Sequence, residues 1–351
     1  MTLAEGHPLT LGTERAPSAA SGTGTGGGTG TGTGTGTEGD ANRGGYVGAW
    51  AVAGVLLVGL ALSVWGRWIL SGEQFSPAPI LGPDRMPTWN LVVLRIEEAL
   101  SFVEMAALFT FAVVLPLKRS GRLGLDAKIA LGCLCGSVTD GVLNFHQYLF
   151  AWNAHSVNLG SWAEFIPTST AKQTRYAEAL IWGIPMYTYF CIGVAVYGCR
   201  LILRMRAKNP RLSNARAFGT VFALACVFDI VVENLVVRLG HGYAFAKTPS
   251  ALTIDAGSQF QFPLYETFCV AMLGVLFTGL RLSAIDAPDG LSYVERGFHR
   301  LRPALQGPAR WFAVIGWAIT TLFVVYHLPF QFFGQAGNSA ADLPSYMLPG
   351  R

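Results

Sequence analysis

The sequence predicts an all-α fold, a polytopic membrane helix bundle with about seven transmembrane helices. Composition is the first reason, because hydrophobic residues make up 51% of the 351 residues and charged residues only 13%. Soluble domains carry about 25% charged residues, so a chain this poor in charge lacks the side chains to cover a surface that faces water. The second reason is that long apolar segments recur along the chain after a polar start.

Seven apolar segments are long enough to cross a bilayer, whose hydrocarbon core of about 30 Å requires about 20 residues of helix. They are residues 46–70, 89–117, 128–152, 176–205, 215–239, 263–282 and 311–330. Several are flanked by Trp or Tyr, which membrane interfaces favour. We therefore expect a multi-pass protein of the cell membrane, embedded in the lipid bilayer, whose first apolar segment is an uncleaved anchor.

The predicted domain organisation has three parts. Residues 1–45 form a tail rich in Gly and Thr, which buries too little apolar surface to fold and is expected to be disordered. Residues 46–335 form the transmembrane helical domain, and residues 336–351 form a short C-terminal tail.

Basic residues in the connecting segments predict the orientation. Lys and Arg concentrate in the second, fourth and sixth connections, for example at Lys118, Arg206 and Arg300, and are sparser in the other three. The positive-inside rule places the basic connections in the cytoplasm, so we expect a cytoplasmic N-terminus and an external C-terminus. The long third and fifth connections, rich in aromatic residues, then lie at the outer end, either as a cover over a site or as interfacial anchors.

Several functional classes are excluded by what the sequence lacks. The net charge of +4 comes without a basic run, so no nucleic-acid partner is expected. The six cysteines lie in apolar stretches without metal-binding spacing. Neither a phosphate-binding loop nor an HExxH or Asp-rich diphosphate motif is present, and no lysine lies deep in an apolar segment where retinal would attach. We therefore expect no cofactor and no metal. Nothing in the sequence bears on the oligomeric state.

The informative residues are polar ones inside the apolar segments, where an ionisable group costs about 3 kcal/mol and persists only if it is paired, hydrated or used. The second segment carries Arg95, Glu97, Glu98 and Glu104. Arg95 and Glu98 are three residues apart and can pair on one helix face, so Glu98 is either one half of a neutralising pair or a functional acid. Glu97 and Glu104 share another face and have no evident partner on that helix.

The third segment, interpreted as one helix, carries a polar stripe. Asp140, Asn144, Gln147 and Tyr148 occupy positions i, i+4, i+7 and i+8. A polar stripe on an apolar helix must face protein or water rather than lipid. It therefore either lines a site or supplies hydrogen bonds between helices.

The fifth segment carries Asp229 and Glu233 one helical turn apart. Two like charges this close repel, so we expect one of them to hold a proton at neutral pH; structural pairing with another helix is the alternative. His241 follows on a second stripe, and Glu266 lies near the start of the sixth segment. A lone histidine such as His327 in the seventh segment is expected to be a packed hydrogen-bonding residue.

With the predicted orientation, Glu98, Asp140, Glu233 and Glu266 lie at similar depth in four different segments. We therefore expect them to meet in one polar pocket in the outer half of the bundle, with the third and fifth connections over its mouth. In an apolar pocket, a protonated carboxyl group serves as a general acid, and an ionised one serves as a base or stabilises a cation. Cofactor-independent acid–base chemistry on an apolar substrate, such as cyclisation, dehydration or isomerisation, fits this pocket.

Three runs of the sequence resemble a known family. They are DGVLNFHQYLFAWNAHSVNLGSW at residues 140–162, ENLVVRLGHGYA at 233–244 and QFPLYE at 261–266. Together they are similar to the AveC-type spirocyclases of actinobacteria, which act in the biosynthesis of avermectin-, milbemycin- and meilingmycin-type macrolides. The resemblance covers roughly residues 45–335. It implies closure of a dihydroxy-ketone polyketide macrolactone to a 6,6-spiroketal and, in some members, dehydration of a ring hydroxyl.

The chemistry of the residues suggests their roles. Protonated Glu233 or Asp229 is the predicted acid, Asp140 is the base or the stabiliser of a cation, and Glu98 is a reserve carboxylate. The predicted substrate contacts are Asn144, Tyr148, Trp162, His241 and Glu266.

Two other functions stay open. A proton-coupled transporter of an apolar small molecule also needs membrane carboxylates, although such proteins usually show two related halves and seven segments do not divide evenly. A ligand-binding sensor is the third possibility. It would need a signalling module, for which the segment after Phe330 is too short.

Overall fold

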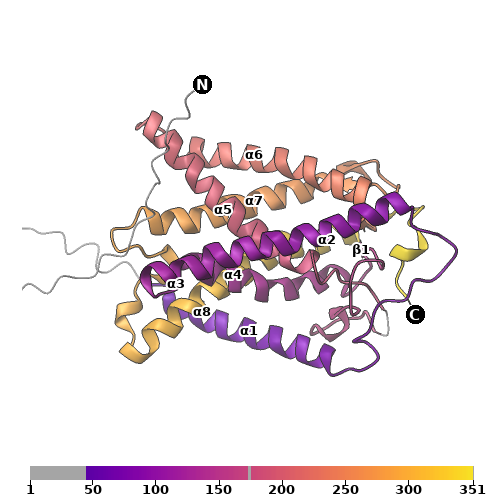
Figure 1. Ribbon diagram of the computed structural model, residues 1–351, viewed down its shortest axis with the longest axis horizontal. Coiled ribbons are helices and arrows are strands. Elements are labelled where there is room, and N and C mark those ends of the chain that lie inside the picture. Colours follow the sequence, from indigo (N-terminus) through magenta and orange to yellow (C-terminus); the bar gives the residue numbers. More distant parts are fainter. Residues whose placement is uncertain (1–44, 173–174, 351) are drawn as a thin grey trace, which may run out of the picture.

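The computed structural model describes residues 45–172 and 175–350. Apart from Gly45, the predicted Gly/Thr-rich tail lies outside these described residues. The described part is a bundle of long helices, with short strands and the C-terminus gathered at one end (Figure 1).

Six apolar helical stretches in the described part are long enough to span a membrane. Their main helices are α1 (Val47–Ile69), α2 (Thr88–Phe109), α5 (Gly183–Lys208), α6 (Asn214–Leu235), α7 (Leu264–Ile285) and α8 (Pro303–Leu322). The predicted fold class, a polytopic helix bundle, is confirmed.

Three of these helices continue through a π-helical turn. The turn at Thr110–Val114 joins α2 to α3 (Leu115–Ser120), and the turn at Phe323–His327 joins α8 to α9 (Leu328–Gln335). A third turn, Val236–Gly240, ends α6. Such turns place one extra residue in a helix and often mark functional positions.

The prediction that residues 128–152 form one helix is wrong. α4 (Leu125–Gly136) is followed by a 3₁₀ helix at Ser137–Asn144, and β1 (Phe150–Trp152) ends the segment. The side chain of Asn144 binds the main chain of the following loop, which competes with continued helix. The chain still passes from the end of the bundle that carries α3 to the end that carries β1 (Figure 1). This third crossing therefore combines a short helix with irregular backbone.

The third and fifth connections build a cap at the end of the bundle that carries the C-terminus (Figure 1). β1 pairs antiparallel with β2 (Tyr243–Phe245). The other pairs are β3 (Lys247–Thr248) with β6 (Asn338–Ser339) and β4 (Thr253–Ile254) with β5 (Phe262–Pro263). Phe150 and Tyr243 stack across the β1–β2 pair with ring centroids 4.7 Å apart. The cap thus joins segments that are about 90 residues apart in the sequence.

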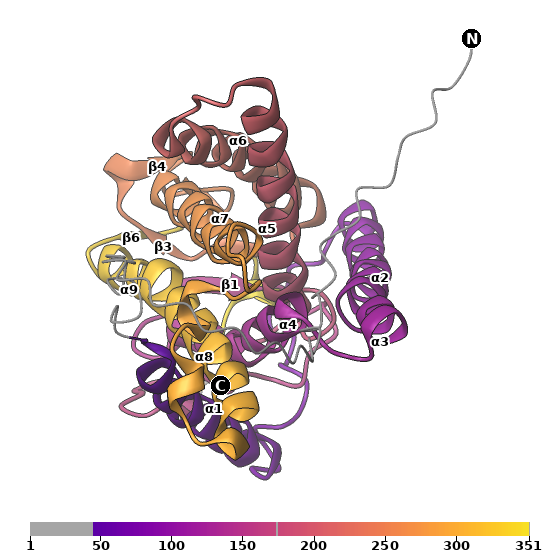
Figure 2. The ribbon, with the colours of Figure 1, turned by 90° about the vertical axis from the view of Figure 1, so that its left-hand side faces the viewer.

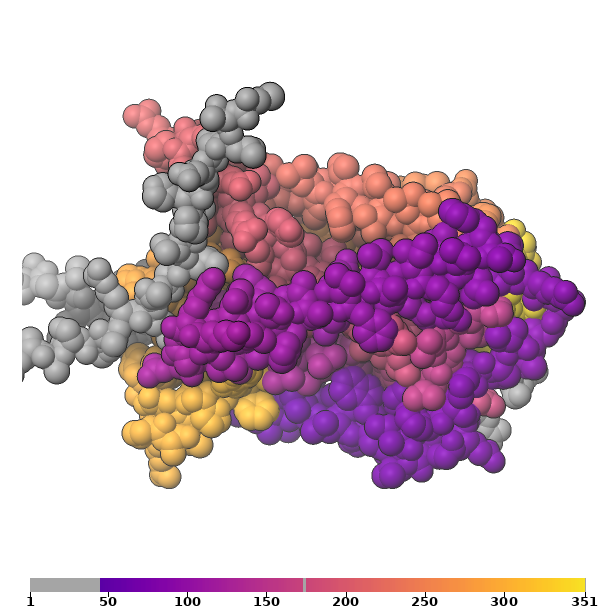
Figure 3. Space-filling view, viewed as in Figure 1, coloured from indigo at the N-terminus to yellow at the C-terminus, as the bar shows by residue number. Residues whose placement is uncertain are grey.

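The outward faces of the helices are apolar, as a lipid environment requires. Exposed large side chains include Leu56 on α1, Phe102 and Val103 on α2, and Val227 and Val231 on α6. α2 stands at the periphery of the bundle (Figure 2) and lies across the face between α1 and α6 (Figure 3). By contrast, α7 lies in the interior between its neighbours (Figure 2). Polar side chains on α7 therefore face protein.

Candidate functional site

Three carboxyl groups from two helices meet inside the bundle. Asp229 and Glu233 lie one turn apart on α6, and Glu266 lies in the first turn of α7, which packs along α6. One oxygen from each carboxyl group lies within 4.8 Å of the others. Asp229 and Glu266 are buried and Glu233 is half-buried. The structure thus brings together three of the predicted site residues, which we call the acid cluster.

Local structure positions the acid cluster. Helical spacing places Asp229 and Glu233 on one face of α6, and the hydroxyl group of Thr267 donates a hydrogen bond of 2.7 Å to Asp229 Oδ2. Pro263 immediately precedes α7, so Glu266 lies at the N-terminal end of that helix, where the helix dipole favours negative charge.

Hydrogen bonds satisfy only one of the two carboxyl oxygens of Glu266. Its Oε1 accepts a long hydrogen bond of 3.4 Å from the hydroxyl group of Tyr326. Its Oε2 is buried and has no hydrogen-bond partner among the described residues. A buried carboxylate oxygen without a partner carries a desolvation cost. Such groups tend to be kept where function requires them.

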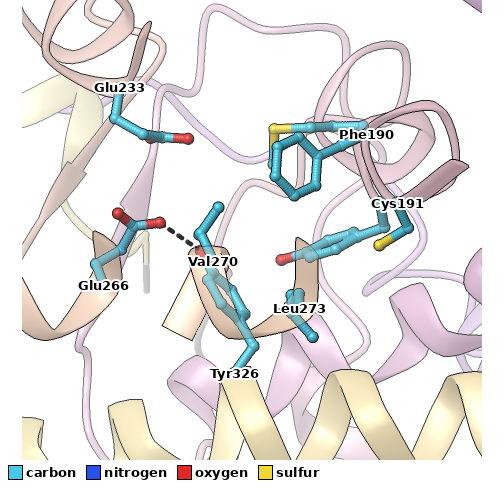
Figure 4. Close-up of a pocket in the computed structure, with 9 residues that line it drawn as sticks. Phe190, Cys191, Glu233, Glu266, Val270, Leu273 and Tyr326 are labelled. Atoms are coloured by element: carbon cyan, nitrogen blue, oxygen red, sulfur yellow. Dashed lines mark hydrogen bonds between the residues drawn. The ribbon is translucent and has the colours of Figure 1, made fainter. Parts of the chain in front are cut away.

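A small cavity of about 30 Å³ adjoins the acid cluster. Its lining comprises Met186, Tyr187, Phe190, Cys191, Glu233, Glu266, Val270, Leu273 and Tyr326. Figure 4 shows the carboxyl groups of Glu233 and Glu266 on one side of this space and Phe190 and Cys191 on the other. The volume suits one or two water molecules, or one reacting functional group of a larger molecule. The two carboxyl groups thus lie on the same side of a largely apolar cavity.

Asp140 lies behind the wall of this cavity, in a second polar group. Its Oδ1 accepts a hydrogen bond of 2.5 Å from the hydroxyl group of Tyr187, and its Oδ2 accepts one of 3.1 Å from Trp152 Nε1. Tyr187 Oη also lies 3.1 Å from His327 Nε2. Tyr187 lines the cavity and Asp140 does not. Tyr187 therefore connects Asp140 to the space that the acid cluster faces.

Glu178 adjoins Asp140 and does not belong to the cavity lining. It is buried and accepts a hydrogen bond of 2.7 Å from Ser161 Oγ. Burial and the neighbouring carboxyl group of Asp140 raise the pKa of Glu178 well above its usual value. Both causes favour the neutral form of Glu178.

Glu98 does not join the cavity. It pairs with Arg95 at 2.5 Å and accepts a hydrogen bond of 2.8 Å from the backbone N–H of Val157. This confirms the predicted pair three residues apart on α2. Glu98 instead ties α2 to the third connection, since both of its oxygens have partners.

The predicted helical stripe through Asn144, Gln147 and Tyr148 is wrong, because the helix ends before it is complete. Asn144 donates to the carbonyl of Phe150 at 2.7 Å and accepts from two backbone N–H groups of the same loop. Tyr148 donates to the carbonyl of Met347. These side chains hold the cap together.

His241 and Trp162 also lie away from the cavity lining. His241 Nδ1 is 3.0 Å from Tyr346 Oη, and burial lowers its pKa to about 4, so the ring is neutral. Trp162 is fully buried, donates to the carbonyl of Val138 at 2.7 Å and packs edge-on against Trp68. Both residues order the cap and its contact with the helices.

Tyr187 and Tyr326 are site residues that no sequence pattern predicted. The only signal for them is a tyrosine inside an apolar segment, which is weak because tyrosine is also common at membrane interfaces. His327 behaves as predicted, as a packed hydrogen-bonding residue, with Thr139 Oγ1 2.9 Å from its Nδ1.

The acid cluster has two chemical interpretations. Three carboxylate oxygens within 4.8 Å are ligands that a hard divalent cation such as Mg²⁺ accepts. Alternatively, the carboxyl groups share protons, as neighbouring carboxyl groups in an apolar site do. Proton sharing needs no further ligand, whereas a hard cation needs about six oxygen ligands and would have to recruit water to complete them.

A family model described as "Spirocyclase AveC-like" matches residues 120–349, which include the acid cluster, Asp140 and the cap. No curated protein and no solved structure matches the chain.

Proposed function

This chain belongs to the AveC-like spirocyclase family, and from that premise we propose that it closes a dihydroxy-ketone polyketide macrolactone to a 6,6-spiroketal by carboxylate acid–base catalysis. The observation that carries the mechanism is the acid cluster at a small, largely apolar cavity inside the bundle. The lining offers carboxyl and phenol groups, which transfer protons.

The proposed reaction has three steps. A first hydroxyl group adds to the ketone and gives a hemiketal. An acid then protonates the hemiketal hydroxyl, which leaves as water, and an oxocarbenium ion forms. A base finally takes the proton of the second hydroxyl group as its oxygen bonds to the cationic carbon. Spiroketals also close without a catalyst, so the protein's main task is to hold one face of the cation open.

We assign the acid to Glu233, with Asp229 as its partner in holding the proton. Glu233 lines the cavity and Asp229 does not. At an effective dielectric constant of about 20, a second negative charge at 4.8 Å costs about 3.5 kcal/mol. The cluster therefore keeps at least one proton near neutral pH. Its ionised members stabilise the oxocarbenium ion once the proton has left.

The remaining predicted residues take supporting roles in this proposal. Glu266 lines the cavity and contacts the reacting hydroxyl groups. Asp140 is the base, reached through the cavity wall, and Glu98 stays a reserve carboxylate because it is already paired with Arg95. Asn144, Tyr148, Trp162 and His241 hold the cap over the substrate.

The cavity admits only the reacting part of a macrolactone, because drug-sized ligands fill about 300–1,000 Å³. The bulk of such a substrate would lie among the helices or in lipid, and its binding requires the helices around the cavity to separate. Dehydration of a ring hydroxyl would use the same acid and a base, and it is proposed only as a second activity.

The test is turnover by membranes that contain the protein, with a synthetic dihydroxy-ketone as the probe. We expect Asp229→Asn, Glu233→Gln and Asp140→Asn each to lower the rate of spiroketal formation about 10²- to 10⁴-fold, the usual contribution of general acid–base catalysis. Glu104→Gln, which removes an exposed membrane carboxyl group outside the cavity lining, is the matched control and should keep the wild-type rate. Unchanged yield and stereochemistry in all three site variants would refute the assignment.

Proton-coupled transport of an apolar small molecule is the alternative, because buried membrane carboxyl groups also serve that function. Sealed vesicles made from the same membranes distinguish the two functions. A transporter would accumulate the dihydroxy-ketone unchanged when a pH gradient is applied, whereas the proposed enzyme converts it without a gradient.

A further inference from the structure

We propose that Tyr187 is a catalytic residue that takes the proton from the substrate's second hydroxyl group, and that Asp140 and His327 are positioning residues that act through it. This inference rests on the proposed spirocyclase function and adds the group through which the base, Asp140, reaches the substrate. It follows from the placement of one phenol group between a cavity and two buried acceptors.

The geometry makes Tyr187 the contact between Asp140 and the cavity. Asp140 is only 3% exposed and does not belong to the cavity lining, so a substrate in the cavity does not touch it. The phenol oxygen of Tyr187 lies 2.5 Å from Asp140 Oδ1, and Tyr187 itself lines the cavity together with Glu266 and Glu233. A base at Asp140 therefore reaches the substrate by way of this hydroxyl group.

The hydrogen bonds around His327 show that two acceptors compete for the hydroxyl proton of Tyr187. The hydroxyl group of Thr139 donates to the carbonyl of Gly136 at 2.6 Å. His327 Nδ1 then faces two acceptor oxygens, Thr139 Oγ1 at 2.9 Å and the carbonyl of Leu322 at 3.2 Å. A neutral imidazole therefore carries its single proton on Nδ1.

This tautomer leaves His327 Nε2 as an acceptor, 3.1 Å from the phenol oxygen of Tyr187. Tyr187 has one proton to donate, and both Asp140 Oδ1 and His327 Nε2 accept it. A phenol whose proton is drawn toward buried acceptors has a more basic oxygen, whose remaining lone pair is available to a donor in the cavity. The arrangement thus prepares Tyr187 to receive a proton from a substrate hydroxyl group.

The proton transfer is balanced. The O–H bond of the second hydroxyl group breaks as its oxygen forms a bond to the oxocarbenium carbon, and that proton moves to Tyr187 Oη. The original phenol proton moves at the same time to Asp140 Oδ1. The acid cluster has already given one proton to the departing water, so the protein gains one proton and loses one. To restore the starting state, Asp140 returns its proton to Tyr187 as Tyr187 releases the substrate proton to water in the cavity. That water carries the proton to Glu233, which lines the same space.

The test compares Tyr187→Phe with Tyr197→Phe, using the dihydroxy-ketone probe and subtracting the rate in membranes without the protein. Tyr187→Phe keeps the ring and removes only the hydroxyl group, and we expect kcat to fall about 100-fold or more with KM little changed. Tyr197 lies on the same helix but is 70% exposed and outside the cavity lining, so Tyr197→Phe should keep the wild-type kcat.

The second readout is whether the losses in kcat of Asp140→Asn and Tyr187→Phe add up in the double variant. A merely structural role for Asp140 would give additive losses. Asp140→Asn should lower kcat while KM stays within twofold, and the double variant with Tyr187→Phe should be no slower than the slower single variant. His327→Gln, which retains an acceptor, should lose less activity than His327→Leu. If Tyr187→Phe does not accumulate in the membrane, the kcat–KM split of Asp140→Asn and the His327 pair decide the question.

The outcomes are distinguishable from those of the proposed function. A Tyr187→Phe variant with kcat within twofold of wild type, while Glu233→Gln is inactive, overturns this inference and leaves the spirocyclase proposal in place. Additive losses in the double variant overturn the coupling of Tyr187 to Asp140. Full activity in Glu233→Gln, Asp140→Asn and Tyr187→Phe together would refute both proposals.

Discussion

Replacing Glu266 by Gln should raise the stability of the folded protein and lower its catalytic activity. Glu266 is fully buried, its Oε2 has no hydrogen-bond partner among the described residues, and two other carboxyl groups lie within 4.8 Å. An unsatisfied buried polar atom costs about 1–3 kcal/mol, and each ionised neighbour at this distance adds about 3.5 kcal/mol of repulsion when Glu266 is itself ionised. A glutamine removes the charge, and its amide group donates hydrogen bonds to Asp229 or Glu233.

We therefore expect the free energy of unfolding of Glu266→Gln to rise by about 1–3 kcal/mol, and the rate of spiroketal formation to fall at least tenfold. Thermal unfolding in detergent, followed by circular dichroism, measures the first effect, and turnover of the dihydroxy-ketone measures the second. Functional sites commonly show this opposition between stability and activity.

Glu98→Gln is the matched control, because both oxygens of Glu98 have partners, Arg95 and the backbone of Val157. Arg95 is about half exposed, so the loss should be near 1 kcal/mol, in the destabilising direction. A lower melting temperature for Glu266→Gln, equal to that of Glu98→Gln, would refute the reasoning, since it would show that Glu266 is satisfied by its surroundings.

Three further predictions concern pH, metals and topology. Burial alone would raise the pKa of Glu295, but Lys128 and Arg310 hold it below its usual value. The stability that these interactions contribute is present above about pH 4.3, the pKa of the unfolded state, and is lost as the pH falls further. Glu295→Gln should therefore reduce the fall in melting temperature between pH 5 and pH 3. Washing with a chelator should leave turnover unchanged; a loss that Mg²⁺ restores would make the acid cluster a cation site. A reporter fused near Trp162 should signal outside the cytoplasm, and a cytoplasmic signal would invert the proposed orientation.

Hydropathy was sufficient to predict most of the helices, because a membrane-spanning helix needs only length and apolar side chains. The third segment shows where this reasoning fails. Its composition is apolar enough for a helix to Trp152, but Asn144 forms local hydrogen bonds with the main chain of residues 149 and 150 and thereby favours a loop. The strand that follows is stabilised by pairing with residues 243–245, about 90 positions away, which a local pattern does not contain.

In the candidate site, too, local contacts were predictable and long-range contacts were not. Asp229 and Glu233 were predictable as neighbours because helical periodicity alone places them on one face, and Arg95 and Glu98 were predictable as a pair for the same reason. The contacts of Tyr187 with Asp140 and His327 span 47 and 140 residues. They depend on how α5, the π-helical turn after α8 and the 3₁₀ helix pack together, so no sequence spacing signals them.

The prediction that acids from four segments share one pocket is correct for only some of them. Glu266 joins Asp229 and Glu233 because α6 and α7 pack along each other, whereas Glu98 is held by its own neighbours at the edge of the bundle. Asp140 reaches the shared space through a tyrosine. Similar predicted depth therefore correctly grouped Glu233 with Glu266, but it wrongly included Glu98.

The ratio of the two spiro epimers formed by the purified protein in lipid nanodiscs tests the central claim most directly. If Glu233 is the acid that opens the cation inside the cavity, the wild-type protein yields one epimer in excess over spontaneous closure, and Glu233→Gln returns both the ratio and the rate to the spontaneous values. The same epimer excess at the same rate in Glu233→Gln would show that the acid cluster does not carry out the reaction.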